Sequence, residues 1–205
     1  MGVQASTINL DSSAATTTNN SSEATVNINP NPAWATALAG SNWISNGQTG
    51  NPSDPGYTVY PDGTTVLFSE SFNLSGNVTA AMLSVMADDT TSVVVNGTTI
   101  YAATNLPVSG YPTCSSQPIG CLTSTQENFT LAQLSPYLKS GSNTIQFDVY
   151  QKNMVSFGLD YAGSISTSQT PEPASLWMIG SGLVFLGLAS RRVRAYQASG
   201  RESNN

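Results

Sequence analysis

The chain has 205 residues, enough for one ordinary domain with tails. Only 9% of the residues are charged and the formal net charge is −6, whereas about a quarter of the residues are charged in an average globular protein. The chain contains no histidine, which excludes Ser-His-Asp and Cys-His catalytic sites and any zinc site with a histidine ligand.

The charges are divided unevenly along the chain. Before residue 171 there are ten acidic and two basic residues, a net charge of −8, and the remaining bases are Arg191, Arg192, Arg194 and Arg201. An acidic body repels the phosphate backbone of nucleic acids, so we expect no nucleic-acid partner.

Residues 1–23 are rich in Ser, Thr and Asn and include the run TTTNNSSE. This low complexity predicts a flexible segment. The first residues, MGVQASTINLDSS, contain neither a basic stretch nor an apolar one, so they do not read as a secretory signal peptide. We therefore expect the given sequence to start at or near the mature end of an exported protein.

Residues 24–166 read as short β-strands separated by turn residues. Asn96-Gly97, between two β-branched runs, is a strong signal for a tight hairpin. The predicted strands are 24–29, 64–72, 79–87, 92–95, 98–101, 127–131, 143–150 and 155–165, with a helical turn at 131–138. No long amphipathic helix is present, so we predict an all-β fold, a two-sheet antiparallel β-sandwich of the jelly-roll kind.

The order of these segments over residues 64–165 resembles the galactose-binding-like sandwich. The resemblance lies in a strand that ends at Asp88-Asp89, a strand that enters Asn96-Gly97, and the later run LKSGSN (138–143) before a long strand. It implies a domain that binds sugars in many relatives, in some with a structural calcium ion.

Asp88 and Asp89 are the candidate metal ligands. Adjacent carboxylates repel each other, and a hard cation such as calcium relieves that repulsion through oxygen ligands. The pair also resembles the paired aspartates of calcium-dependent flocculin-type adhesins. The alternative is a solvated turn stabilised by Asx hydrogen bonds.

Trp34 and Trp43 are the candidate carbohydrate-binding residues, because aromatic faces suit the C–H face of a pyranose ring. The alternative is that both indoles cover the core at the start of the sandwich. Cys114 and Cys121 would form a disulfide in an oxidising compartment, whereas in a reducing one they would be free thiols.

Residues 174–190 form a run of 17 residues without charge, followed by Arg191, Arg192 and Arg194. As a helix this run would span roughly 25 Å, slightly less than a bilayer core. The alternative, a buried core helix, would show one polar face, and this run shows none. We predict a transmembrane helix with residues 191–205 as a basic cytoplasmic tail and the acidic body outside.

A linker, 167–173, precedes the apolar run and ends in Pro171-Glu172-Pro173. The tripeptide, the apolar helix and the arginine cluster together resemble the PEP-CTERM sorting signal of bacterial exported proteins. The resemblance implies that an exosortase cleaves near the tripeptide, so that the helix anchors the protein only transiently. The protein then passes to the cell surface or to an exopolysaccharide matrix.

These observations favour a non-enzymatic exported surface or matrix protein whose sandwich binds glycan or matrix components. One alternative is a structural matrix or filament subunit that makes protein contacts through sheet edges and loops. Another is a secreted hydrolase, but a glycosidase needs two carboxylates roughly 5–9.5 Å apart in a cleft, and nothing in the sequence indicates such a pair. We therefore expect no enzymatic activity and no cofactor apart from the calcium considered for Asp88 and Asp89.

Overall fold

The computed structural model describes residues 5–103, 113–116 and 118–168. Over these ranges, no helix combines the length and apolarity that crossing a membrane requires. The Pro-Glu-Pro tripeptide, the apolar run 174–190 and the arginines that follow it lie outside the described residues.

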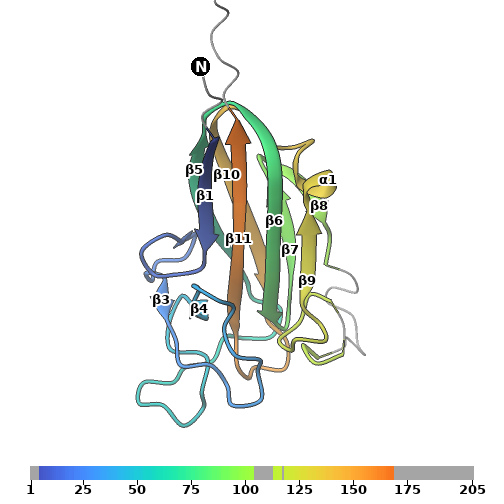
Figure 1. Ribbon diagram of the computed structural model, residues 1–205. Coiled ribbons are helices and arrows are strands. Elements are labelled where there is room, and N and C mark those ends of the chain that lie inside the picture. Colours follow the sequence, from blue (N-terminus) through green and yellow to red (C-terminus); the bar gives the residue numbers. More distant parts are fainter. Residues whose placement is uncertain (1–4, 104–112, 117, 169–205) are drawn as a thin grey trace, which may run out of the picture. The chain divides into compact units, whose positions relative to one another are not determined.

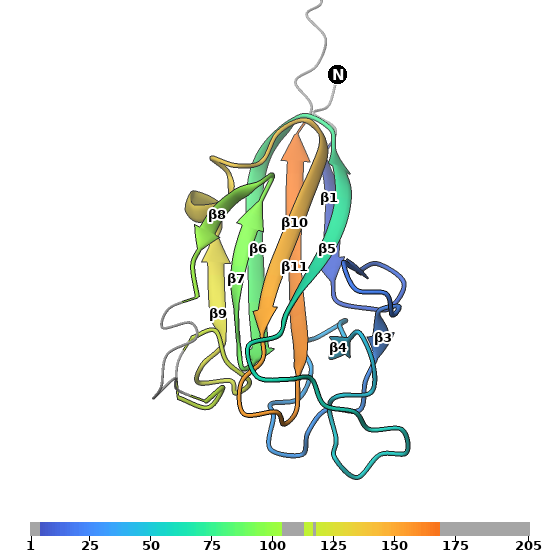
Figure 2. The ribbon, with the colours of Figure 1, turned by 180° about the vertical axis from the view of Figure 1, so that it is seen from behind.

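Two antiparallel sheets pack face to face (Figures 1 and 2). The first has the order β3 (Val26–Asn27), β4 (Ile44–Ser45), β11 (Gly158–Ser168), β6 (Asn77–Asp88), β9 (Glu127–Thr130), and β1 (Ala5–Asp11) also pairs with β11. The second has the order β2 (Thr18–Asn19), β5 (Thr65–Leu74), β10 (Gly141–Tyr150), β7 (Thr90–Val95), β8 (Thr98–Tyr101). The predicted all-β sandwich is confirmed, and the predicted helical turn is the short α1 (Leu131–Leu134).

The core lies between the sheets and follows from the period-two alternation of the strands. In β10, Ile145, Phe147 and Val149 are buried and alternate with half-buried polar residues. Phe147 stacks on Tyr161 of β11 at a centroid distance of 4.4 Å. The hairpin predicted at Asn96-Gly97 is confirmed, because both residues have the positive φ that a tight β7–β8 turn requires.

The prediction of a flexible segment at 1–23 is wrong for its described part. Strand β1 pairs with β11 over seven residues, from Ala5 opposite Ser168 to Asp11 opposite Ala162. Leu10 is buried in the core and Ile8 packs against it. Polar residues alternate with these two apolar ones, so the strand looks like low complexity in the sequence although its inner face is apolar.

Candidate functional site

The structure joins two of the predicted sites in a single contact. The indole Nε1–H of Trp34 donates to Oδ2 of Asp88 at 2.7 Å, and both side chains are buried. Burial and the neighbouring charge of Asp89 raise the pKa of Asp88 well above its usual range. The carboxylate at the end of β6 therefore anchors a tryptophan from the loop that covers this sheet.

Asp89 is also buried and accepts a hydrogen bond from a backbone amide. The N–H of Lys152 donates to its Oδ2 at 2.5 Å, and burial raises the pKa of Asp89 to about 6. Across the ranges that the structure describes, no three His, Cys, Asp or Glu side chains come together as a metal-binding group. Calcium binding by Asp88 and Asp89 stays a prediction, whereas the solvated turn is wrong because both side chains are buried.

Trp34 and Trp43 form a small second core on the outer face of the first sheet. Their rings lie 4.4 Å apart at an interplanar angle of 36° and pack with Ile28, Met86 and Cys121. Trp34 is 9% exposed and Trp43 is 1% exposed. An exposed sugar-stacking platform is therefore wrong for this pair, because neither indole presents a free face to solvent.

The disulfide prediction is confirmed: Cys114 and Cys121 are bonded, with their Cα atoms 5.0 Å apart. Cys121 packs in the same second core, and its carbonyl oxygen accepts a hydrogen bond from the N–H of Ala35 at 2.8 Å. The loop closed by the disulfide thus packs against the loop between β3 and β4 that carries Trp34.

Asp160 of β11 is a second buried carboxylate that anchors the loop between β3 and β4. This residue was not singled out from the sequence. Its carboxylate accepts hydrogen bonds from the hydroxyls of Ser12 and Ser41 and from the N–H of Leu38, at 3.0, 2.5 and 2.8 Å. Burial raises the pKa of Asp160. The residue stabilises the loop, and its carboxylate is enclosed rather than open to a ligand.

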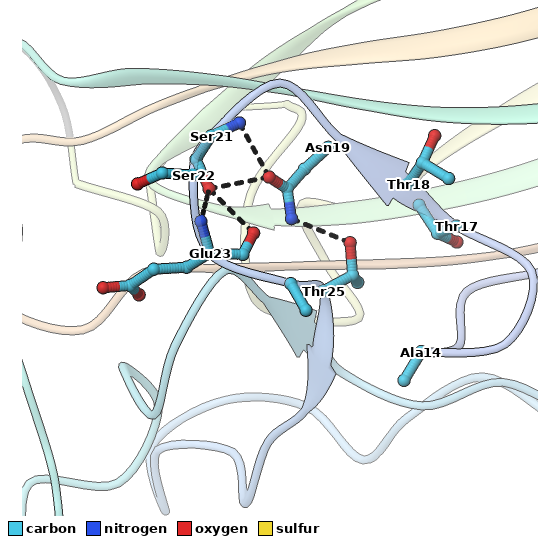
Figure 3. A pocket seen from close by; sticks show the side chains of 9 residues that line it. Ala14, Thr17, Thr18, Asn19, Ser21, Ser22, Glu23 and Thr25 are labelled. Carbon is cyan, nitrogen blue, oxygen red and sulfur yellow. Dashed lines mark hydrogen bonds between the residues drawn. The ribbon is translucent and has the colours of Figure 1, made fainter.

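The candidate binding site is a hollow of about 430 Å³ formed by the chain segment 14–25 (Figure 3). It is lined by hydroxyl groups, one amide, one carboxylate and two alanines: Ala14, Thr17, Thr18, Asn19, Ser21, Ser22, Glu23, Ala24 and Thr25. None of the described residues that line it is aromatic. Such a lining offers several hydroxyl, amide and carboxylate groups at short range, beside the methyl groups of its alanines and threonines.

Internal hydrogen bonds hold this segment in shape. The side chain of Asn19 donates to Thr25 Oγ1 at 2.9 Å and accepts from both the N–H and the hydroxyl of Ser21, as Figure 3 shows. The hydroxyl of Tyr60 donates to the Glu23 carboxylate at 3.1 Å. The lining is therefore ordered before any ligand arrives, which lowers the entropic cost of binding.

A buried polar chain connects the hollow to the core. Thr17 Oγ1 lies 2.7 Å from the hydroxyl of Tyr161, which donates to Glu70 Oε2 at 2.9 Å. Burial raises the pKa of Glu70 to about 7, and the negative charge of Asp11 adds to the shift. Burial also raises the pKa of Tyr161. The chain spans both sheets, since Glu70 belongs to β5 and Tyr161 to β11.

The sequence offers no signal for this site. Residues 14–25 read as low complexity, and their hollow depends on the main-chain path between β1 and β3 rather than on a motif. Glu70 and Tyr161 lie 91 residues apart in sequence, so their pairing appears only in the fold.

Comparisons with known proteins find a sorting motif in this chain and solved structures that are similar to it. Residues 169–193 match the PEP-CTERM protein-sorting motif. The chain is similar to the native structure of a family 35 carbohydrate binding module from Clostridium thermocellum. The identity is 11% and the TM-score 0.41, over 77% of this chain and 97% of that one. A search of curated proteins found no match. The chain therefore carries a PEP-CTERM protein-sorting motif at 169–193, C-terminal to an all-β two-sheet sandwich, and is an exported protein sorted at the cell envelope.

Proposed function

We propose that the protein is a non-enzymatic surface or exopolysaccharide-matrix protein whose sandwich binds carbohydrate in the hollow formed by residues 14–25. The sorting motif supports the route to the surface. In this route the apolar run 174–190 holds the chain in the membrane. Transfer across the membrane stops at Arg191, Arg192 and Arg194. An exosortase then cleaves near Pro171-Glu172-Pro173.

The observation that carries the binding proposal is the chemistry of the hollow. Hydroxyl, amide and carboxylate groups are the partners that sugar hydroxyls require, and here they converge in a volume within the usual range for ligand sites, roughly 300–1,000 Å³. The lining lacks an aromatic ring for stacking, so hydrogen bonds carry the recognition and we expect weak affinity for a single site. Many copies at one surface would strengthen the binding through avidity.

The acidic groups support a binding role rather than a hydrolytic one. Among the described residues that line the hollow, Glu23 alone carries a carboxylate. The nearby Glu70 is buried beneath Thr17 and accepts a hydrogen bond from Tyr161. A glycosidase needs two carboxylates that both reach the substrate, and the hollow supplies one.

A glycan array with calcium, and again with a chelator, tests the proposal. The blocking variant is Ser22→Trp, because Ser22 is exposed and lines the hollow, so that an indole there fills the space. The matched control is Ser53→Trp, an exposed loop serine that does not line the hollow. We expect binding by the wild type and the control and its loss in Ser22→Trp. Absence of binding under both ionic conditions, or equal binding by both variants, would overturn the proposal.

A structural subunit of the matrix is the second candidate function. One observation favours it: β1 (Ala5–Asp11) lies at a sheet edge with exposed, uncharged residues along most of its length.

A further inference from the structure

The direction of the hydrogen bonds at β1 shows which backbone groups face outward. The N–H of Ser12 donates to the carbonyl of Tyr161 at 2.9 Å, so Ser12 faces the neighbouring strand β11. The next residue faces the other way, because the carbonyl of Asp11 accepts a hydrogen bond from Thr16 Oγ1 rather than from β11. Since bonded residues alternate in an antiparallel ladder, Asn9, Thr7 and Ala5 face outward as Asp11 does.

This outward row is open within the described part of the chain. Strand β1 pairs there with β11 and with no other strand, and Ala5, Thr7 and Asn9 are all exposed. Their N–H and C=O groups therefore form a template for an added strand.

Natural proteins protect such edges with charges, prolines or very short strands, and β1 has none of these from Ala5 to Leu10. The other edges of the described sandwich are better protected. Strand β9 has four residues, includes Glu127 and leads directly into α1, and β8 also has four residues. The edge of β5 that extends beyond β2 is short and runs from Glu70 to Leu74.

We propose that β1 pairs antiparallel with β1 of a second copy of this chain, about a two-fold axis at Thr7. Thr7 would then lie opposite Thr7 of the second copy, and Ala5 opposite Asn9 of the second copy. These are hydrogen-bonded pairs, so the contact forms about six backbone hydrogen bonds and joins the two first sheets into one.

The neutral strand allows two acidic copies to meet here, and the position of Asp11 favours the antiparallel orientation. The body of the chain up to residue 170 has a net charge of −8, so two copies repel each other over most of their surface, whereas residues 5–10 are neutral. In antiparallel pairing the two Asp11 side chains lie at opposite ends of the new contact. The paired threonines at its centre are a favourable cross-strand combination.

The contact is small compared with a stable dimer interface, which buries roughly 1,600 Å². We therefore expect association that depends on concentration and that is strongest where exported copies are crowded at the cell surface.

Oxidative cross-linking of a Thr7→Cys variant tests the pairing. Opposite Cα atoms in a hydrogen-bonded pair lie about 5.5 Å apart, which is within the range that a disulfide spans. The control is Ser53→Cys, an exposed cysteine in a loop away from any strand edge. With the full chain in detergent we expect several-fold more disulfide-linked dimer from Thr7→Cys than from Ser53→Cys. Equal dimer yields would overturn the proposal.

A second substitution separates strand pairing from simple proximity. Asn9→Pro removes an outward N–H that β11 does not use, so the fold tolerates it while the new ladder loses a donor. We expect Thr7→Cys with Asn9→Pro to cross-link no more than the Ser53→Cys control while keeping the near-UV circular dichroism of the parent. Undiminished cross-linking in a folded double variant would refute pairing through the β1 edge. Glycan binding by the hollow is read independently, so failure of either proposal leaves the other testable.

Discussion

Replacing Glu70 by glutamine should change how the stability of the sandwich depends on pH. Burial raises the pKa of Glu70 from 4.5 to about 7, and its side chain is 7% exposed. In the unfolded chain the carboxyl group loses its proton near pH 4.5, whereas in the folded chain it keeps the proton until about pH 7. The stabilisation from this proton is therefore complete below pH 4.5 and is lost as the pH rises to 7.

The size of the effect follows from the difference between the two pKa values. One pKa unit corresponds to about 1.4 kcal/mol, so the wild type should lose about 3 kcal/mol of unfolding free energy from Glu70 between pH 4.5 and 7.5. Glutamine is neutral at every pH and keeps an oxygen for the hydroxyl of Tyr161. Glu70→Gln should therefore match the wild type near pH 4.5 and exceed its stability by up to about 3 kcal/mol at pH 7.5.

Urea unfolding followed by tryptophan fluorescence at pH 4.5, 6 and 7.5 measures this difference. Asp88, Asp89 and Asp160 also have raised pKa values, so the test is the difference between variant and wild type rather than the slope of either. A difference that is constant with pH, or a variant that is less stable at pH 7.5, would refute the assignment of Glu70 as a buried carboxyl with a raised pKa.

Three other predictions concern the loop that covers the first sheet and the sorting signal. Trp34→Phe keeps an aromatic ring but leaves buried Asp88 without its indole donor, so denaturant unfolding should show a loss of about 1–3 kcal/mol; an unchanged midpoint would contradict the anchor. Removing the disulfide with Cys114→Ser and Cys121→Ser should cost about 2–3 kcal/mol for so short a loop. Equal melting of the double variant and the wild type would show that the bond does not stabilise the fold. Alanine at Pro171, Glu172 and Pro173 should leave an unprocessed, membrane-held form on immunoblots of cell fractions, and normal processing would refute the assigned role of the tripeptide.

The sequence correctly predicted the strands and turns that can be recognised from their own residues. The alternation of Ile145, Phe147 and Val149 and the Asn96-Gly97 dipeptide indicate β10 and the β7–β8 hairpin without reference to the rest of the chain. Several strand boundaries were displaced by a few residues, because the sheet extends wherever a partner continues.

Long-range contacts explain what local patterns missed. Strand β1 contains two inward apolar residues, Ile8 and Leu10, and becomes a strand because β11 pairs with it. The contact of Trp34 with Asp88 joins residues 54 positions apart, and that of Leu38 with Asp160 joins residues 122 apart. The first contact joins one residue from each of two sites that were predicted separately, a result that the residue types alone do not reveal.

Backbone amide shifts of the isotope-labelled chain, titrated with exopolysaccharide from the producing bacterium, test the central claim most directly. We expect saturable shifts in residues 17–25 and, through the polar chain under the hollow, at Tyr161 and Glu70. Saturable shifts confined to another surface, or no shifts at all, would contradict the claim that this hollow binds carbohydrate.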